Sequence, residues 1–162
     1  MTDNAIKVGM ADLKHTRHPG VLVTLGLGSC VGIALYDKRT KMIGLAHIML
    51  PWSEQARNNI NKAKFADTGI KQLLDFMLES GSKKGNIVAK IAGGAQMFSF
   101  SQTTDMIRVG QRNVEATKEV LHGLGIPIVS EDTGGNYGRT IEFYSDDGRL
   151  MVKTIGYGVR FI

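Results

Sequence analysis

The sequence predicts an α/β (α+β) sandwich, in which a mixed, largely antiparallel sheet with hairpins packs with two main helices. Short apolar, β-branched runs recur between polar or glycine-containing turns, and only two stretches have clear helical periodicity. Hairpins outnumber βαβ units, which disfavours a parallel, doubly wound fold. The 162 residues contain no linker, repeat or low-complexity run, so we expect a single domain over residues 1–162.

The first half of the chain predicts a β-hairpin behind a glycine-rich turn. Val21–Gly26 is a short apolar run typical of a strand, and the turn GLGS follows at Gly26–Ser29. Cys30–Tyr36 and Lys41–Met49 are the two hairpin strands, joined by the polar turn DKRT at Asp37–Thr40.

The rest of the chain predicts both helices and the remaining strands. Residues 52–64 are polar and are a surface loop or a frayed helix, whereas apolar residues at helical spacing predict a helix over Asp67–Ser80. The further expected elements are a strand at Asn86–Ala92, a helix at Gln111–His122, a strand at Ile126–Ser130, a glycine-rich loop at Glu131–Arg139 and a hairpin of Thr140–Tyr144 with Leu150–Ile155.

Composition argues against several classes of protein. The formal charge is +5, but basic residues are scattered without interleaved aromatics, which disfavours nucleic-acid binding and leaves open an acidic protein partner or an ordinary soluble surface. One cysteine cannot form an internal disulfide, and no C-x-x-C or H-E-x-x-H motif indicates a metal. No stretch resembles a signal peptide or approaches the roughly 20 apolar residues of a membrane span. We therefore expect a cytoplasmic protein without membrane insertion.

The only cysteine, Cys30, directly follows the glycine turn, and one histidine lies in the strand predicted to pair with it. If DKRT is a four-residue connection, Tyr36 pairs with Lys41 and Cys30 lies directly opposite His47. Opposed residues have Cβ atoms about 4.5–5.5 Å apart, which allows a thiol–imidazole contact. A small core cysteine and a structural histidine remain the alternative interpretation.

The turn itself suggests two further parts of a catalytic site. Backbone N–H groups of Gly28, Ser29 and Cys30 can converge as an oxyanion hole, and Thr24 is the nearest candidate to orient His47. A phosphate cradle is disfavoured, because the turn matches neither G-x-G-x-x-G nor a Walker motif.

Several spaced motifs resemble the CheD family, the chemoreceptor glutamine deamidases of bacterial chemotaxis. The resemblance covers about residues 7–156 and leaves out the terminal YGVRFI. The motifs are VTLGLGSCVGIALYD and GLAHIMLP, KFADTGIKQLL (Lys64–Leu74), KIAGGAQMF (Lys90–Phe98), GQRNVEATKEVL (Gly110–Leu121) and EDTGGNYGRTIEF (Glu131–Phe143).

The resemblance implies a catalytic triad in which Cys30 is the nucleophile, His47 the base and Thr24 the orienting residue. It implies hydrolysis of glutamine side chains on methyl-accepting chemotaxis proteins through a thioester, and a sandwich fold related to bacterial toxin deamidases. Neither a metal nor an organic cofactor is implied. The implied partner is CheC, a phosphatase that acts on phosphorylated CheY.

The role of two glycine pairs and the activity itself each allow an alternative. The glycine pairs Gly93-Gly94 and Gly134-Gly135 either form the rim of a substrate cleft or are ordinary turns at a sheet edge. The same thiol chemistry would also hydrolyse a glutamyl methyl ester, and the protein could instead act mainly as a non-catalytic binding module for CheC and receptors.

Overall fold

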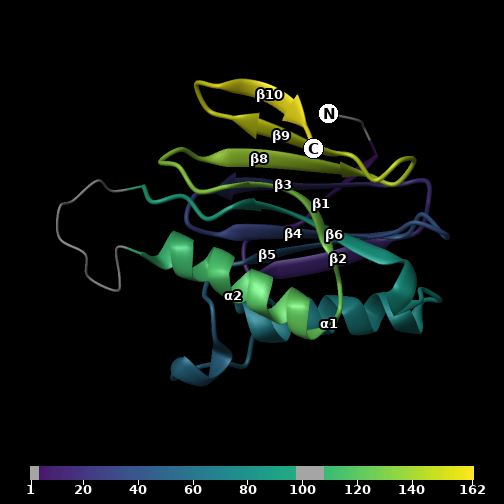
Figure 1. Cartoon of the computed structure of the whole chain (residues 1–162), viewed down its shortest axis with the longest axis horizontal. Coiled ribbons are helices and arrows are strands. Elements are labelled where there is room, and N and C mark those ends of the chain that lie inside the picture. Colours follow the sequence, from purple (N-terminus) through teal and green to yellow (C-terminus); the bar gives the residue numbers. More distant parts are fainter. Residues whose placement is uncertain (1–3, 98–107) are drawn as a thin grey trace.

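The protein, described here from a computed structural model over residues 4–97 and 108–162, consists of three layers. An outer five-stranded sheet packs on a central five-stranded sheet, and two helices cover the other face of the central sheet (Figure 1). The last residue of the KIAGGAQMF motif, Phe98, lies outside the described residues.

The two sheets are each mixed and largely antiparallel. β1 runs parallel to β3 in the outer sheet, and β6 runs parallel to β7 in the central sheet. In order across the outer sheet, the strands are β1 (Ala5–Lys7), β3 (Val21–Leu27), β8 (Arg139–Tyr144), β9 (Leu150–Thr154) and β10 (Gly158–Phe161). In order across the central sheet, they are β2 (Asp12–Thr16), β5 (Ile43–Ile48), β4 (Val31–Asp37), β6 (Ile87–Gly93) and β7 (Ile128–Thr133).

The helices α1 (Ala66–Glu79) and α2 (Val109–Gly123) lie side by side against the central sheet (Figure 1). Their buried residues recur at helical spacing, so each helix presents one apolar stripe to the strands. The described residues also form the single-turn 3₁₀ helices η1 (Ser53–Gln55), η2 (Lys62–Lys64) and η3 (Lys84–Asn86). Within the described residues, neither helix is both long and apolar enough to span a bilayer.

The central sheet is buried on both faces and therefore separates two apolar cores. One core lies between the central sheet and the helices, and includes Ile33 and Ile70. The other lies between the two sheets, and includes Leu45, Ile141 and Cys30. Burial on both faces explains why β5 is an unbroken apolar run except for His47, rather than an alternating one.

The predicted fold class is confirmed, but the strands form two sheets rather than one. The predictions of both helices and of most strands match within about three residues. β1, β2 and β10 were not predicted, because these short segments are at most half-buried and lack an apolar run. The loop expected from Glu131 begins at Gly134, since β7 continues to Thr133 alongside β6.

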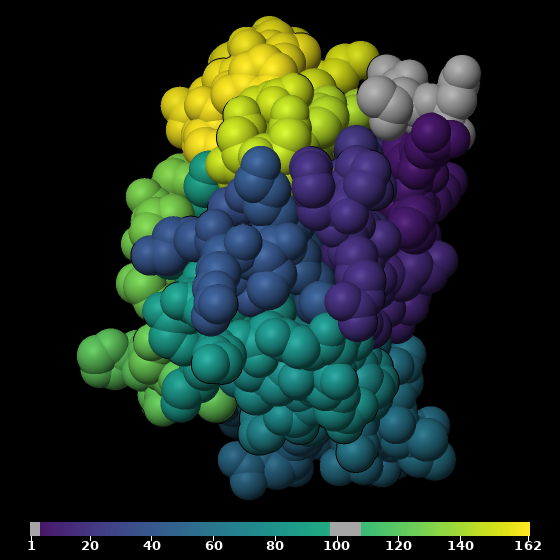
Figure 2. Space-filling model, turned by 90° about the vertical axis from the view of Figure 1, so that its right-hand side faces the viewer, coloured from purple at the N-terminus to yellow at the C-terminus, as the bar shows by residue number. Residues whose placement is uncertain are grey.

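The register predicted for the hairpin is wrong by two residues. Tyr36 pairs with Ile43 rather than Lys41, so His47 lies opposite Gly32 rather than Cys30. The connection is longer because the Asp37 carboxylate accepts the amides of residues 39 and 40, and the Asp37 amide donates to the Met42 carbonyl at 2.9 Å. Figure 2 shows this connection, in blue, between the C-terminal hairpins above and the α1 region below.

Candidate active site

Thr24, Cys30 and His47 come together between the two sheets. Thr24 projects from β3 of the outer sheet, His47 from β5 of the central sheet, and Cys30 directly precedes β4. Thr24 and His47 are fully buried, and Cys30 is 7% exposed. The three residues expected to form a triad therefore lie in one region of the inter-sheet core, at the end of the sandwich that holds the glycine turn.

A short hydrogen bond joins Thr24 to His47 across the two sheets. The Thr24 hydroxyl donates to the Val8 carbonyl at 2.7 Å, and its oxygen lies 2.7 Å from Nδ1 of His47. Since the hydroxyl hydrogen is committed to Val8, the Thr24 oxygen must accept from Nδ1–H. The neutral imidazole therefore carries its proton on Nδ1, and Nε2 is left as a base.

The free nitrogen of His47 is available on the face that Cys30 shares. Nε2 is buried and has no hydrogen-bond partner among the described residues. Cys30 lies two positions before Gly32, the direct partner of His47, so Cys30 and His47 are diagonal neighbours on one face. Gly32 contributes no side chain there, and a Cβ at Gly32 would come within 2.7 Å of Ile141. The observed register differs from the predicted one by two residues, so Cys30 and His47 still lie on the same face of the sheet. A difference of one residue would have placed them on opposite faces.

Burial keeps this pair uncharged at neutral pH. Desolvation raises the pKa of the Cys30 thiol above its ordinary value, although the residue's own backbone N–H opposes the change. Desolvation lowers the pKa of His47, and the negative charge of Asp12 opposes that change. Asp12 is the register partner of His47 on β2. A raised thiol pKa favours the neutral thiol, and a thiol in that form would require a base in order to react as a nucleophile.

Three consecutive carbonyl groups, those of residues 28 to 30, hold the end of the glycine turn in place. The Gly28 carbonyl accepts the Ala95 amide at 2.8 Å, and the Cys30 carbonyl accepts the Gly94 amide at 2.8 Å. The Ser29 carbonyl between them accepts a side-chain amide hydrogen of Asn113 at 3.0 Å. Of the amides expected to form an oxyanion hole, that of Gly28 donates to the Gly26 carbonyl at 3.1 Å.

Asn113 was not singled out from the sequence. It lies on α2 one turn before Thr117, and both side chains are fully buried. Its side-chain nitrogen also donates to the Met49 carbonyl at 2.9 Å. The sequence did contain a sign of its importance: Asn113 and Thr117 are polar residues four positions apart on one side of the predicted helix. Buried polar groups need hydrogen-bond partners in the core.

Three of the four glycines expected at a cleft rim line one cavity. Gly94, Gly134 and Gly135 border a space of about 400 Å³ beside α2. Gly93 does not line it, but its carbonyl accepts the Gly134 amide at 3.0 Å. The same carbonyl lies 3.4 Å from the fully buried Arg139, which pairs with Asp132 at 3.0 Å. Whether a substrate enters this cavity remains a prediction.

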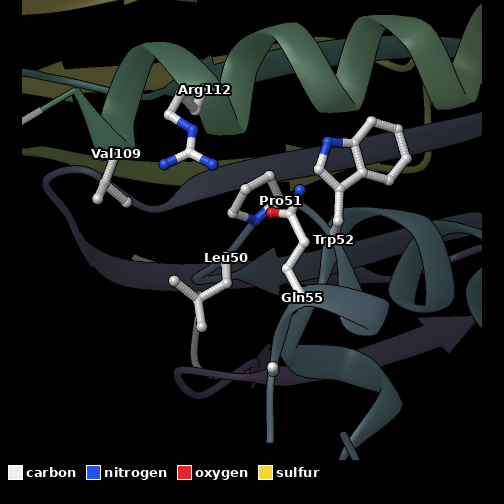
Figure 3. A pocket seen from close by; sticks show the side chains of 7 residues that line it. Leu50, Pro51, Trp52, Gln55, Val109 and Arg112 are labelled. Atoms are coloured by element: carbon white, nitrogen blue, oxygen red, sulfur yellow. The ribbon is translucent and has the colours of Figure 1, made fainter. Parts of the chain in front are cut away.

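A second cavity lies where the chain leaves β5 (Figure 3). It has a volume of about 290 Å³, and the Arg112 guanidinium from α2 lies over its apolar wall. The lining residues are Leu50, Pro51, Trp52, Gln55, Ala56, Val109 and Arg112. Within residues 4–97 and 108–162, no group of three or more histidine, cysteine or acidic side chains is placed to hold a metal ion.

Comparison with known proteins gives one consistent family. Residues 49–154 match the sequence model of the family described as "CheD chemotactic sensory transduction". A protein of Caldanaerobacter subterraneus subsp. tengcongensis named "Probable chemoreceptor glutamine deamidase CheD" is 61% identical over all of both chains. A Halalkalibacterium halodurans protein named "Chemoreceptor glutamine deamidase CheD" is 50% identical over 99% of each chain.

A solved structure with partial likeness is "Crystal structure of Bacillus licheniformis hypothetical protein YfiH". It has a TM-score of 0.49 and 19% identity, and the likeness covers 75% of this chain and 50% of that one. The sequence relatives, by contrast, extend over the whole chain, including Thr24, Cys30 and His47, which precede the residues matched by the family model. The chain therefore belongs to the CheD family.

Proposed function

We propose that this protein is a cysteine amidohydrolase that converts specific glutamine side chains of methyl-accepting chemotaxis receptors to glutamate. The observation that carries the proposal is the Thr24–His47 hydrogen bond, which leaves Nε2 as an unpartnered base on the face that Cys30 occupies. The names of the relatives supply the substrate class, since each is named a chemoreceptor glutamine deamidase.

The first half of the proposed reaction forms a thioester and releases ammonia. Nε2 of His47 takes the thiol proton while Sγ of Cys30 attacks the side-chain amide carbon, and the carbonyl oxygen becomes an oxyanion. Backbone N–H groups at the turn stabilise this oxyanion. The carbon–nitrogen bond then breaks as His47 returns its proton to the leaving nitrogen, which departs as ammonia.

The second half hydrolyses the thioester. Nε2 of His47 takes a proton from water, whose oxygen attacks the thioester carbon through a second oxyanion. The carbon–sulfur bond breaks, the thiolate regains the proton from His47, and the product is a glutamate side chain. Each proton that His47 accepts is returned, so the cycle needs no cofactor. A glutamyl methyl ester would follow the same route with methanol as the leaving group.

The proposed substrate places the protein in the cytoplasm, where the helical signalling domains of these receptors lie. The proposed regulatory partner is CheC, as implied by the family resemblance. A role confined to binding CheC and receptors is the competing function, and it requires no reactive thiol.

Mass spectrometry of a purified receptor cytoplasmic fragment tests the proposal. The wild type should convert specific glutamines to glutamate, with a mass increase of one dalton at each site, whereas Cys30→Ala and His47→Ala should not. His122→Ala, which changes a histidine outside the inter-sheet core, is the matched control and should retain activity. Conversion by Cys30→Ala at the wild-type rate would refute the nucleophile. Restored adaptation in cells by an inactive Cys30→Ala protein would favour the binding role.

A further inference from the structure

Asn113 links the turn that carries Cys30 to the strand that carries His47. Its side-chain nitrogen donates one hydrogen to the Ser29 carbonyl at 3.0 Å and the other to the Met49 carbonyl at 2.9 Å. Both acceptors are carbonyl oxygens, so the amide cannot be reversed without setting oxygen against oxygen. Asn113 therefore acts as a double donor of fixed orientation, delivered to the site by α2.

The hydrogen bond to Ser29 determines where the amide of Cys30 points. Ser29 C=O and Cys30 N–H belong to one planar trans peptide group and point in opposite directions. With the carbonyl held toward α2, the N–H is directed to the opposite side of the turn. The Cys30 backbone N–H also opposes the rise in the pKa of its own thiol. A substrate oxyanion would develop on the carbon bonded to that sulfur, two bonds from Sγ.

The Ser29 carbonyl is bound by a side chain, whereas the two neighbouring carbonyls are bound by backbone amides. Backbone amides of Gly94 and Ala95 hold the Cys30 and Gly28 carbonyls, and such groups do not depend on side-chain type. The Ser29 carbonyl, in contrast, is held by a side chain whose oxygen Oδ1 is buried without a partner among the described residues. A buried amide oxygen without a partner lowers stability, so what Asn113 contributes here comes from its two donors.

We propose that Asn113 is a positioning residue of the deamidation reaction: it orients the Ser29–Cys30 peptide so that the Cys30 N–H stabilises the oxyanion. This inference rests on the proposed function for its reaction. Its geometric content, an N–H aimed at the oxyanion on the carbon bonded to Cys30 Sγ, applies to any acylation of the thiol.

The test compares Asn113→Leu with Thr117→Val. Both variants replace a fully buried polar side chain on the same side of α2 with an apolar one of similar size. Asn113 donates a hydrogen bond to the turn, whereas the Thr117 hydroxyl has no hydrogen-bond partner among the described residues. We expect Asn113→Leu to lower kcat for receptor deamidation about 10- to 100-fold with KM changed less than about threefold, because a small misplacement costs this much. Thr117→Val should retain wild-type kcat.

Two reagents separate positioning of the oxyanion donor from general damage. Cys30 is the only thiol, so both reactions report on it alone. Alkylation by iodoacetamide is a direct displacement without an oxyanion, and Asn113→Leu should keep its rate within about threefold of the wild type. Acylation by p-nitrophenyl acetate forms an oxyanion and should slow by at least about tenfold.

Each outcome decides between the alternatives. Wild-type kcat in Asn113→Leu, or equal losses in Thr117→Val, overturns the positioning role, as does an equal loss of alkylation and acylation. If Asn113→Leu does not fold, Asn113→Ser, which retains one donor, takes its place: its kcat should fall below that of the wild type, and wild-type kcat in Asn113→Ser overturns the positioning role. If the wild type acylates but deamidates no receptor glutamine, the proposed function fails, while the acylation ratio still tests Asn113.

Discussion

The oxygen of Thr24 lies 2.7 Å from Nδ1 of His47, and its hydroxyl hydrogen is committed to the Val8 carbonyl. This relationship crosses from the outer sheet to the central sheet and selects one tautomer of a buried imidazole. A neutral hydroxyl achieves this without adding charge to the core, unlike a carboxylate in the same position. Nε2 of His47 is thereby left as the unprotonated nitrogen, as the proposed role of a base requires.

Replacement of Thr24 tests the tautomer directly. Thr24→Val preserves the shape of the side chain but removes the acceptor for Nδ1–H, so we expect kcat for deamidation to fall on the order of 10²-fold, the lower range of general-base catalysis. Thr24→Ser keeps the hydroxyl and should retain most of the activity. Steady-state kinetics on a receptor fragment measure both, and equal activity in Thr24→Val and the wild type would contradict the assignment.

The pH dependence of activity should report the lowered pKa of His47. Only neutral His47 can take the thiol proton, so kcat/KM should fall on the acid side at a pH below the ordinary histidine value of about 6.5. Asp12 raises the pKa of His47, and Asp12→Asn should therefore move this acid limb to still lower pH. A limb that moved to higher pH in Asp12→Asn would show that another group controls the profile.

The lowered pKa of His47 and the raised pKa of Cys30 together predict a pH at which the folded protein is most stable. Because folding lowers the pKa of His47, the unfolded chain binds the proton more readily, and stability should be lost as the pH falls below about 6.5. Because folding raises the pKa of Cys30, stability should be lost as the pH rises above about 8.5. Urea unfolding from pH 5 to 10 measures both limbs. His47→Gln should flatten the acid limb, and Cys30→Ala should flatten the alkaline one.

Gly93 supports the reactive turn through its backbone conformation. Its φ is +113°, and a Cβ there would overlap the Cys30 carbonyl oxygen. We expect Gly93→Ala to lower the free energy of unfolding by about 2 kcal/mol or more and to reduce activity, because strain and overlap add. Gly123→Ala, in α2 with open space around its Cα, is the control and should raise stability by up to about 1 kcal/mol. Thermal or urea unfolding of both variants checks the difference.

Local sequence patterns were sufficient to predict the two helices and the hairpin strands, because amphipathic spacing and β-branched runs involve residues that are close in the chain. They did not predict β10, which is exposed throughout, and they did not predict that the strands divide into two sheets. The hairpin register was mispredicted because the Asp37 carboxylate organises a connection longer than the polar turn suggests.

The sequence by itself determined that one thiol follows a glycine turn and that a lone histidine interrupts an apolar strand. It also determined, through family resemblance, that Thr24 belongs with them. Only the tertiary structure decided that Thr24 acts from a different sheet, that Nδ1 carries the proton, and that Asn113 holds the Ser29 carbonyl. These relationships join residues between 23 and 84 positions apart, and such contacts arise from the packing of layers rather than from local periodicity.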